Sequence, residues 1–142
     1  MKNIIISFFL LVMCGTFSFA QCNKKVTLIS STTEYLNGNN ELQRSETEKT
    51  TIKIDKSALT ISPGNEEHVM DGTIKSDSCH WKVPYKEGKT IIKALLTDKS
   101  GDTKNATITI EGKGGKVTLV MEVQEMPDRK IRVPIDTFEE TK

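Results

Sequence analysis

The chain has 142 residues, of which 27% are charged and 36% hydrophobic, and its formal net charge at pH 7 is +1. A chain of this length fits one ordinary domain and can bury a core of its own, so its folding does not require a second domain or a structural metal. The nearly balanced charge gives no electrostatic basis for binding nucleic acid or an anionic membrane.

The first residues have the pattern of a secretory signal peptide. A basic start at Lys2 precedes an almost unbroken apolar run over residues 4–12. Ser18 and Ala20 are the small residues expected just before a cleavage site. The apolar run is too short for a membrane-spanning helix. We therefore predict a signal peptide over residues 1–20 that is removed during export.

Residues 21–142 are expected to form a single all-β domain in the periplasm or outside the cell, with no stable membrane insertion after cleavage. Cleavage would remove Cys14 and leave Cys22 and Cys79. In an exported chain two cysteines allow only one intramolecular pairing, and a bridge across this long loop would stabilise the fold by about 4 kcal/mol in the chain-entropy model. We predict a Cys22–Cys79 disulfide, with two free thiols as the alternative.

A long hairpin is predicted over residues 24–51. Its turn is the Asn-Gly-Asn-Asn sequence at residues 37–40, which is a strong turn signal. The return segment, residues 42–51, is polar, and as a short helix it would have only Leu42 on its apolar face. We favour an exposed strand that runs on into residues 52–54.

Several short strands are expected after this hairpin. One covers residues 58–61 and is ended by Pro63 and Gly64, because proline lacks a backbone donor and glycine permits a turn. A weakly patterned strand follows over residues 69–75, and a separate strand covers residues 79–85. The alternation in this last strand predicts one buried, aromatic-rich face, formed by Cys79, Trp81, Val83 and Tyr85.

The most regular alternation lies within residues 89–124. Apolar residues at every second position predict three antiparallel strands, joined by two loops that are rich in glycine and charge. Another strand is expected over residues 131–135. Phe138 is a candidate to pin the tail, and residues 139–142 are expected to be frayed because they have no apolar group to bury.

No motif for catalysis, a metal or a cofactor is present in the sequence. The nearest approach to a metal cluster consists of His68, Asp71, Asp77, Cys79 and His80. These residues lack the compact ligand pairs of zinc sites. There is no G-x-S-x-G nucleophile motif, and the glycine and lysine run at residues 112–116 lacks the spacing of a phosphate-binding loop. We therefore expect a protein that is not an enzyme, with no cofactor.

About eight or nine sequential short strands without a convincing helix resemble the lipocalin-like proteins, whose antiparallel strands curl into a barrel open at one end. The export signal and the size are also similar to small secreted bacterial proteins with lipocalin-like domains. The lipocalin G-x-W motif on the first strand is absent, because Trp81 lies in the middle of the chain. The resemblance implies an all-β, up-and-down antiparallel barrel of about eight strands, with an immunoglobulin-like β-sandwich as the alternative.

Closure of the strands would leave inner side chains that either fill the barrel or line a pocket. The leading functional hypothesis is therefore a non-catalytic binding module for one small apolar ligand. The candidate lining residues are Trp81, Tyr85, Leu96, Ile108, Leu119 and Met121. The alternative for these residues is a packed core. The alternative function is an envelope module that docks a partner protein through an exposed strand edge, such as residues 42–51.

Overall fold

A computed structural model describes residues 22, 24–64 and 66–141 of the chain, and the predicted signal peptide lies outside these residues. They form one antiparallel sheet of nine strands. The strands are β1 (Val26–Asn37), β2 (Leu42–Ile54), β3 (Ala58–Ser62), β4 (Met70–Val83), β5 (Glu87–Thr97), β6 (Thr103–Lys113), β7 (Lys116–Val123), β8 (Arg129–Ile135) and β9 (Thr137–Glu140). A 3-10 turn, η1 (Glu66–His68), lies between β3 and β4. Within the described residues, no helix has the length and apolar character needed to cross a membrane.

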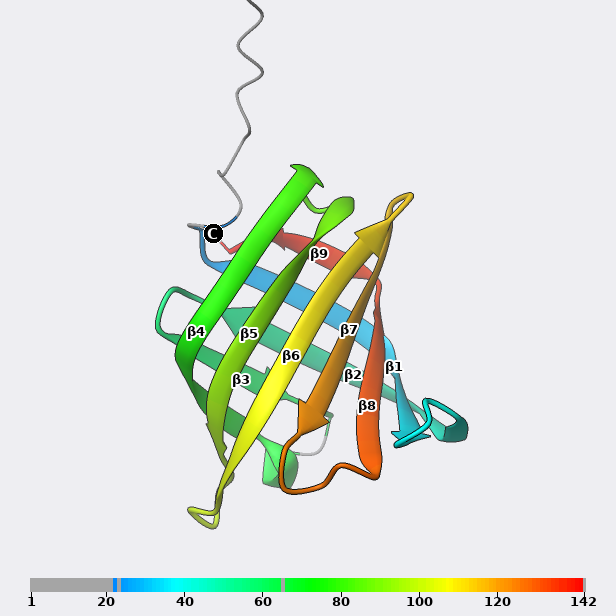
Figure 1. Ribbon diagram of the computed structural model, residues 1–142, viewed down its shortest axis with the longest axis vertical. Helices are drawn as coiled ribbons and strands as arrows, with labels where there is room; N and C mark the ends of the chain where they lie inside the picture. Colours follow the sequence, from blue (N-terminus) through cyan, green and yellow to red (C-terminus); the bar gives the residue numbers. More distant parts are fainter. Residues whose placement is uncertain (1–21, 23, 65, 142) are drawn as a thin grey trace, which may run out of the picture.

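The sheet closes on itself (Figure 1). Each strand from β1 to β7 pairs with the next one in the sequence, and β8 pairs back with β1. This hydrogen-bonded ring confirms the predicted up-and-down antiparallel barrel. The sandwich alternative is wrong, because a sandwich needs two separate sheets and this ring does not divide into two.

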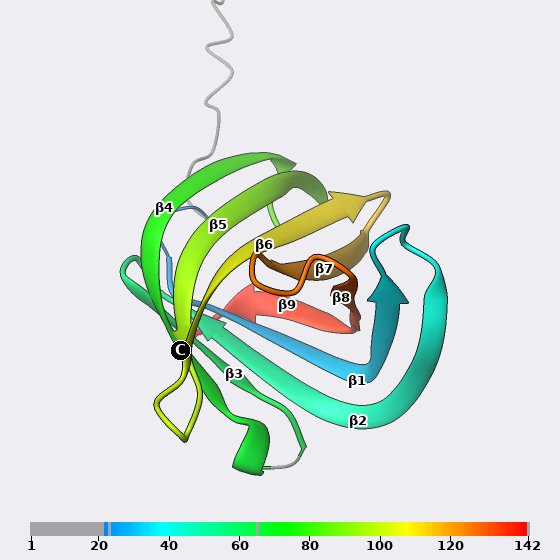
Figure 2. The same ribbon diagram turned by 60° about the horizontal axis from the view of Figure 1, so that its bottom comes forward.

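Strand β1 has two different neighbours along one of its edges. Its first part pairs with β9 from Val26 to Ile29, and its last part pairs with β8 from Glu34 to Asn37. The strand changes partner near Ser30, whose buried hydroxyl lies within hydrogen-bonding distance of the carbonyl oxygens of Thr32 and Pro134. The pairing with β2 is also irregular here, and Figure 2 shows the bend in β1. The same edge of β1 thereby pairs with both β8 and β9.

Alternating side chains build the core, as the sequence predicts for residues 89–124. In β6 and β7 every second residue is buried, and these two strands pair with each other directly. The predicted hairpin of β1 and β2 is also confirmed, including its turn and the strand preferred over a helix for residues 42–51. The largest fully buried apolar side chains are Leu28, Ile52, Leu59, Ile92, Ile108, Ile110 and Leu119.

Two expectations about local structure are wrong. Residues 69–75 and 79–85 are not separate strands, because β4 runs continuously from Met70 to Val83. A register shift between Ile74 and Ser76 interrupts the alternation, so one bulged strand has the pattern of two. A second register shift lies between Trp81 and Val83. The Val83 side chain is therefore exposed, although the alternation predicted it on the buried face.

The tail is also ordered where fraying was expected. Glu139 and Glu140 pair with the start of β1, and the Thr141 hydroxyl lies 2.6 Å from the hydroxyl of Thr27. Phe138 anchors this segment, because its ring packs against the core. The edge of β1 that β8 does not occupy is therefore covered by β9.

Candidate functional site

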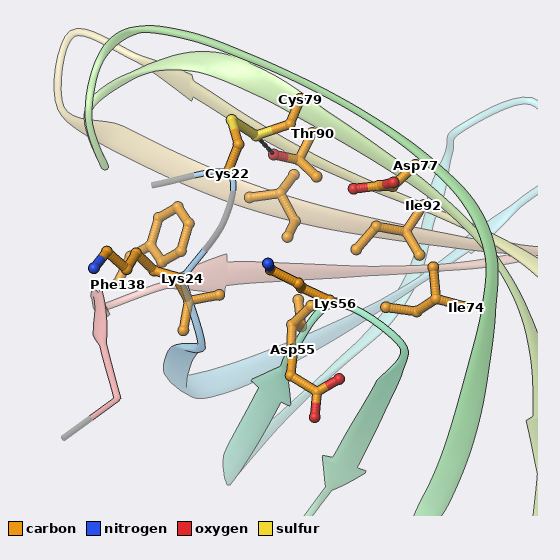
Figure 3. A pocket seen from close by; sticks show the side chains of 13 residues that line it. Cys22, Lys24, Asp55, Lys56, Ile74, Asp77, Cys79, Thr90, Ile92 and Phe138 are labelled. Atoms are coloured by element: carbon orange, nitrogen blue, oxygen red, sulfur yellow. Dashed lines mark hydrogen bonds between the residues drawn. A yellow bond between two sulfur atoms is a disulfide. The ribbon is translucent and has the colours of Figure 1, made fainter. Parts of the chain in front are cut away.

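Two cavities of the barrel are lined by residues from several strands. The first, the disulfide-end cavity, has a volume of about 250 Å³. It is lined by Cys22, Lys24, Val26, Ile54, Asp55, Lys56, Ile74, Asp77, Cys79, Thr90, Ile92, Ile110 and Phe138 (Figure 3). The disulfide between Cys22 and Cys79, with 5.8 Å between their Cα atoms, borders this cavity and confirms the predicted pairing. The bridge ties the segment before β1 to β4.

Asp55 is a polar residue of this cavity that has structural partners. The backbone N–H groups of Ser57 and Ala58 donate to Asp55 Oδ1, each at 2.8 Å, and they lower the pKa of that carboxyl group. In Figure 3 the Asp55 carboxylate points away from the disulfide, whereas the ammonium group of Lys56 points towards the space beneath it. Asp55 therefore holds the turn between β2 and β3 and is not available to a ligand.

Trp81 and Tyr85 lie at the same end as the disulfide. The indole N–H of Trp81 donates to the Thr90 hydroxyl at 2.7 Å, and that hydroxyl lies 3.4 Å from Cys79 Sγ. Tyr85 packs against Phe138, and burial raises the pKa of its phenol, with the Glu140 carboxylate adding to the effect. These aromatic side chains cover the barrel end.

The second cavity, which we call the lateral cavity, has a volume of about 300 Å³ and lies where β2 leaves its neighbour β3. Strand β2 pairs with β3 only from Thr51 to Ile54, whereas it pairs with β1 along nearly its whole length. Figure 2 shows the first half of β2 running beside β1, away from β3. The lining residues are Thr33, Tyr35, Arg44, Glu46, Glu48, Thr50, Ile52, Ile61, Pro63, His68, Met70, Leu119, Met121, Ile131 and Val133.

The lining of the lateral cavity divides into an apolar floor and a polar wall. The floor consists of Ile52, Ile61, Met70, Leu119, Met121, Ile131 and Val133. The polar wall comes mainly from alternate residues of β2, namely Arg44, Glu46, Glu48 and Thr50. Side chains at every second position of a strand point to the same face. The inner face of β2 thus changes from charged at its start to apolar at its end.

The charges on this wall are unequally compensated. Arg44 Nε lies 3.5 Å from Glu46 Oε1, and the Arg44 guanidinium carbon lies 4.1 Å from the centroid of the Tyr35 ring. Glu48 is half-buried and forms no hydrogen bond or ion pair with any residue that the structure describes. The wall therefore carries one carboxylate without a cation, and it has a net attraction for positive charge.

Thr50 is the most unusual polar residue of the lateral cavity. Its side chain is only 3% exposed, and its hydroxyl has no hydrogen-bond partner among the residues described. Buried polar groups in proteins are nearly always paired, since an unpaired one costs about 1–3 kcal/mol. Thr50 is thus a buried residue of the cavity lining whose hydroxyl is unpaired, next to an apolar floor.

The six candidate lining residues do not form one site. Leu119 and Met121 lie together in the floor of the lateral cavity. Leu96 and Ile108 are buried in the core at 3% and 1% exposure. Trp81 and Tyr85 lie at the disulfide end. A ligand role for each of them stays a prediction.

Sequence reasoning missed the polar wall of the lateral cavity. Apolar residues were taken as the markers of the inner face, so the polar segment 42–51 was treated as solvent-exposed ribbon. Ile54 and Ile52 point to the inner face of the barrel, and Thr50 and Glu48 follow them at the same spacing of two residues. This alternation would have placed Thr50 and Glu48 on the inner face as well. The alternation along β2 was therefore the available signal.

No protein-family model, curated protein or solved structure matches the chain. In the part of the chain that the structure describes, no three His, Cys, Asp or Glu side chains are grouped to hold a metal ion. A functional assignment therefore depends on the geometry of the two cavities.

Proposed function

We propose that the protein is a non-catalytic binding module that takes one small apolar molecule into the lateral cavity. The observation that carries this proposal is the apolar floor of the cavity that lies where β2 leaves β3. A barrel of about eight strands has an interior that is either filled by side chains or able to hold one small ligand. Small-molecule sites are mostly apolar, with a few placed polar groups, and the lateral cavity has this composition.

The protein is proposed to act in the periplasm or outside the cell. The disulfide indicates an oxidising compartment, because such bonds are rare in the reducing cytosol. The predicted signal peptide agrees with this location. Intact-mass measurement of the protein purified from an export-competent host would test it, with a mature chain starting at residue 21 as the expected result.

Binding can be tested with a neutral naphthylamine fluorophore that becomes bright in apolar surroundings. Saturable binding to the wild-type protein is expected, and Ile131→Trp should abolish it by filling the cavity. The matched control is Val120→Trp on the neighbouring strand β7, because Val120 does not line the lateral cavity. Equal binding to the two variants, or no binding to wild type, would contradict the proposal. The fluorescence of Trp81 is a poor reporter, since that residue lies at the disulfide end.

A second candidate function is docking of a partner protein onto β2. Within the described strands, residues 42–50 of β2 pair with β1 alone, and Leu42 is 54% exposed. An unpaired strand edge can accept a strand from another chain. A backbone N-methyl group at Ser45, introduced by semisynthesis, would weaken such docking, whereas it would leave fluorophore binding unchanged.

A further inference from the structure

We infer that the polar wall of the lateral cavity selects apolar ligands carrying one uncharged or positively charged hydrogen-bonding group, such as an alcohol or an amine, and rejects carboxylates. Thr50 and Glu48 are the residues that make this selection. The inference rests on the proposed function, because it names the class of molecule that the same cavity would take.

Thr50 supplies the hydrogen-bonding half of the selection. The residue lines the cavity, and its hydroxyl is buried and has no partner among the described residues. A hydroxyl can donate one hydrogen bond and accept others, so it can pair with an alcohol, a carbonyl or an amine. A ligand that brings such a group to Thr50 gains a hydrogen bond that the protein does not make for itself, whereas a pure hydrocarbon leaves the hydroxyl unpaired.

The charges around the cavity supply the second half. The only cationic side chain of lysine or arginine in the described lining is Arg44, which is already engaged by Glu46 and by the Tyr35 ring. Glu48 has no such partner. A ligand carboxylate would meet this uncompensated charge and find no arginine or lysine other than Arg44 in the described lining of this cavity, whereas an ammonium group would be attracted. His68 also lines the cavity, and its side chain is exposed to solvent.

Three probes with one shared alkyl chain separate these effects: octanol, octylamine and octanoate. Each is titrated against the mature protein loaded with the neutral naphthylamine fluorophore. Octanol and octylamine are expected to displace the fluorophore at lower concentration than octanoate. Octylamine and octanoate should displace the fluorophore from wild type at different concentrations. Glu48→Gln should reduce the ratio of these two concentrations by about two- to five-fold, the range expected for a partly exposed charge interaction.

Thr50→Val removes the hydroxyl and retains the shape of the side chain. Octanol affinity should fall about three- to ten-fold, whereas thermal stability should stay equal or rise because a buried unpaired group is lost. The matched control is Thr51→Val, whose side chain does not line the cavity. A role of Thr50 in folding alone would instead lower the melting temperature and leave octanol affinity unchanged.

The outcomes separate this inference from the proposed function. If all three probes displace the fluorophore equally, and Thr50→Val does not change the affinity for octanol, the polar wall does not select among ligands. The apolar binding site would still stand. A lower melting temperature of Thr50→Val with unchanged octanol affinity would also overturn the selection by the polar wall. Failure of the fluorophore to bind the wild-type protein would contradict the proposed function and the inference together.

Discussion

The ring of Phe138 meets the ring of Trp81 edge-on, with 5.6 Å between the ring centroids and 69° between the ring planes. Tyr85 meets Phe138 in a similar way at 4.9 Å. Phe138 lies on β9, and Trp81 lies on β4, far from it in the sequence. The last strand is therefore held in place by aromatic contacts as well as by its pairing with β1.

Truncation of Phe138 should loosen this end of the barrel. Phe138→Ala is expected to lower the free energy of unfolding by about 2 kcal/mol, less than for a fully buried ring because Phe138 is only partly buried. Denaturant unfolding followed by the fluorescence of Trp81, the only tryptophan, measures the change. Glu139→Ala on the same strand is the control and should have little effect. Equal stability of the two variants would show that β9 is not anchored by its ring.

Loss of the disulfide should destabilise the fold more strongly. The bridge joins residues that are 57 positions apart, and the chain-entropy model assigns such a loop about 4 kcal/mol. The variant with Cys22→Ser and Cys79→Ser should therefore unfold at much lower denaturant concentration than oxidised wild type. Reduced wild-type protein is the control and should match the variant. Two alkylatable thiols in unreduced mature protein would contradict the bridge itself.

Gly112 is required for the close approach of β6 to the segment around Trp81. A Cβ atom at Gly112 would lie 2.6 Å from the carbonyl oxygen of Lys86 and 2.8 Å from Trp81 Cζ3. Gly112→Ala should thus cost about 2 kcal/mol of stability and change the emission of Trp81. Gly64→Ala is the control, because the nearest atom to its added Cβ lies at an ordinary 3.6 Å. Equal melting temperatures would contradict the close packing.

Acid should weaken the turn between β2 and β3. The backbone N–H groups of Ser57 and Ala58 lower the pKa of Asp55, so the ionised carboxyl group is favoured in the folded state. Its contribution is present above the unfolded pKa of about 3.9 and is lost as the pH falls through the lower folded value. Asp55→Asn should therefore flatten the loss of unfolding free energy between about pH 5 and pH 2.

Urea unfolding at a series of pH values checks this expectation. Lys56→Gln is the control, since it changes the charge of the same turn but leaves the Asp55 carboxyl group and its two backbone donors in place. Its acid profile should keep the wild-type slope. Identical acid profiles for wild type and Asp55→Asn would show that the carboxyl group does not support the turn.

The alternation of side chains predicted the strands where the pleat is regular. Ile108 and Ile110 on β6 follow a strict period of two, and both are buried at 1% exposure. The pattern failed at Ile74 and Ser76, because a bulge shifts the phase of the side chains within one strand. The pairing of β9 was missed since its stability comes from Phe138 and the free edge of β1, which only the folded chain brings together.

Closure of the barrel was implied by the resemblance to lipocalin-like proteins, with a sandwich as the alternative, and the site was only half predicted. Leu119 and Met121 were chosen from their alternation and lie in the floor of the lateral cavity. Thr50 and Glu48 were passed over because they are polar. The cavity arises where β2 leaves β3, and the alternation within one strand does not tell how far that strand stays paired with its neighbour.

The most direct test of ligand binding in the lateral cavity is an NMR titration of methyl-labelled methionine in the mature protein. Met70 and Met121 line this cavity, whereas Met126 does not. Addition of octanol should shift the methyl resonances of Met70 and Met121 saturably, with a smaller change at Met126. Unchanged resonances of Met70 and Met121, at octanol concentrations that leave the protein folded, would contradict binding at this site.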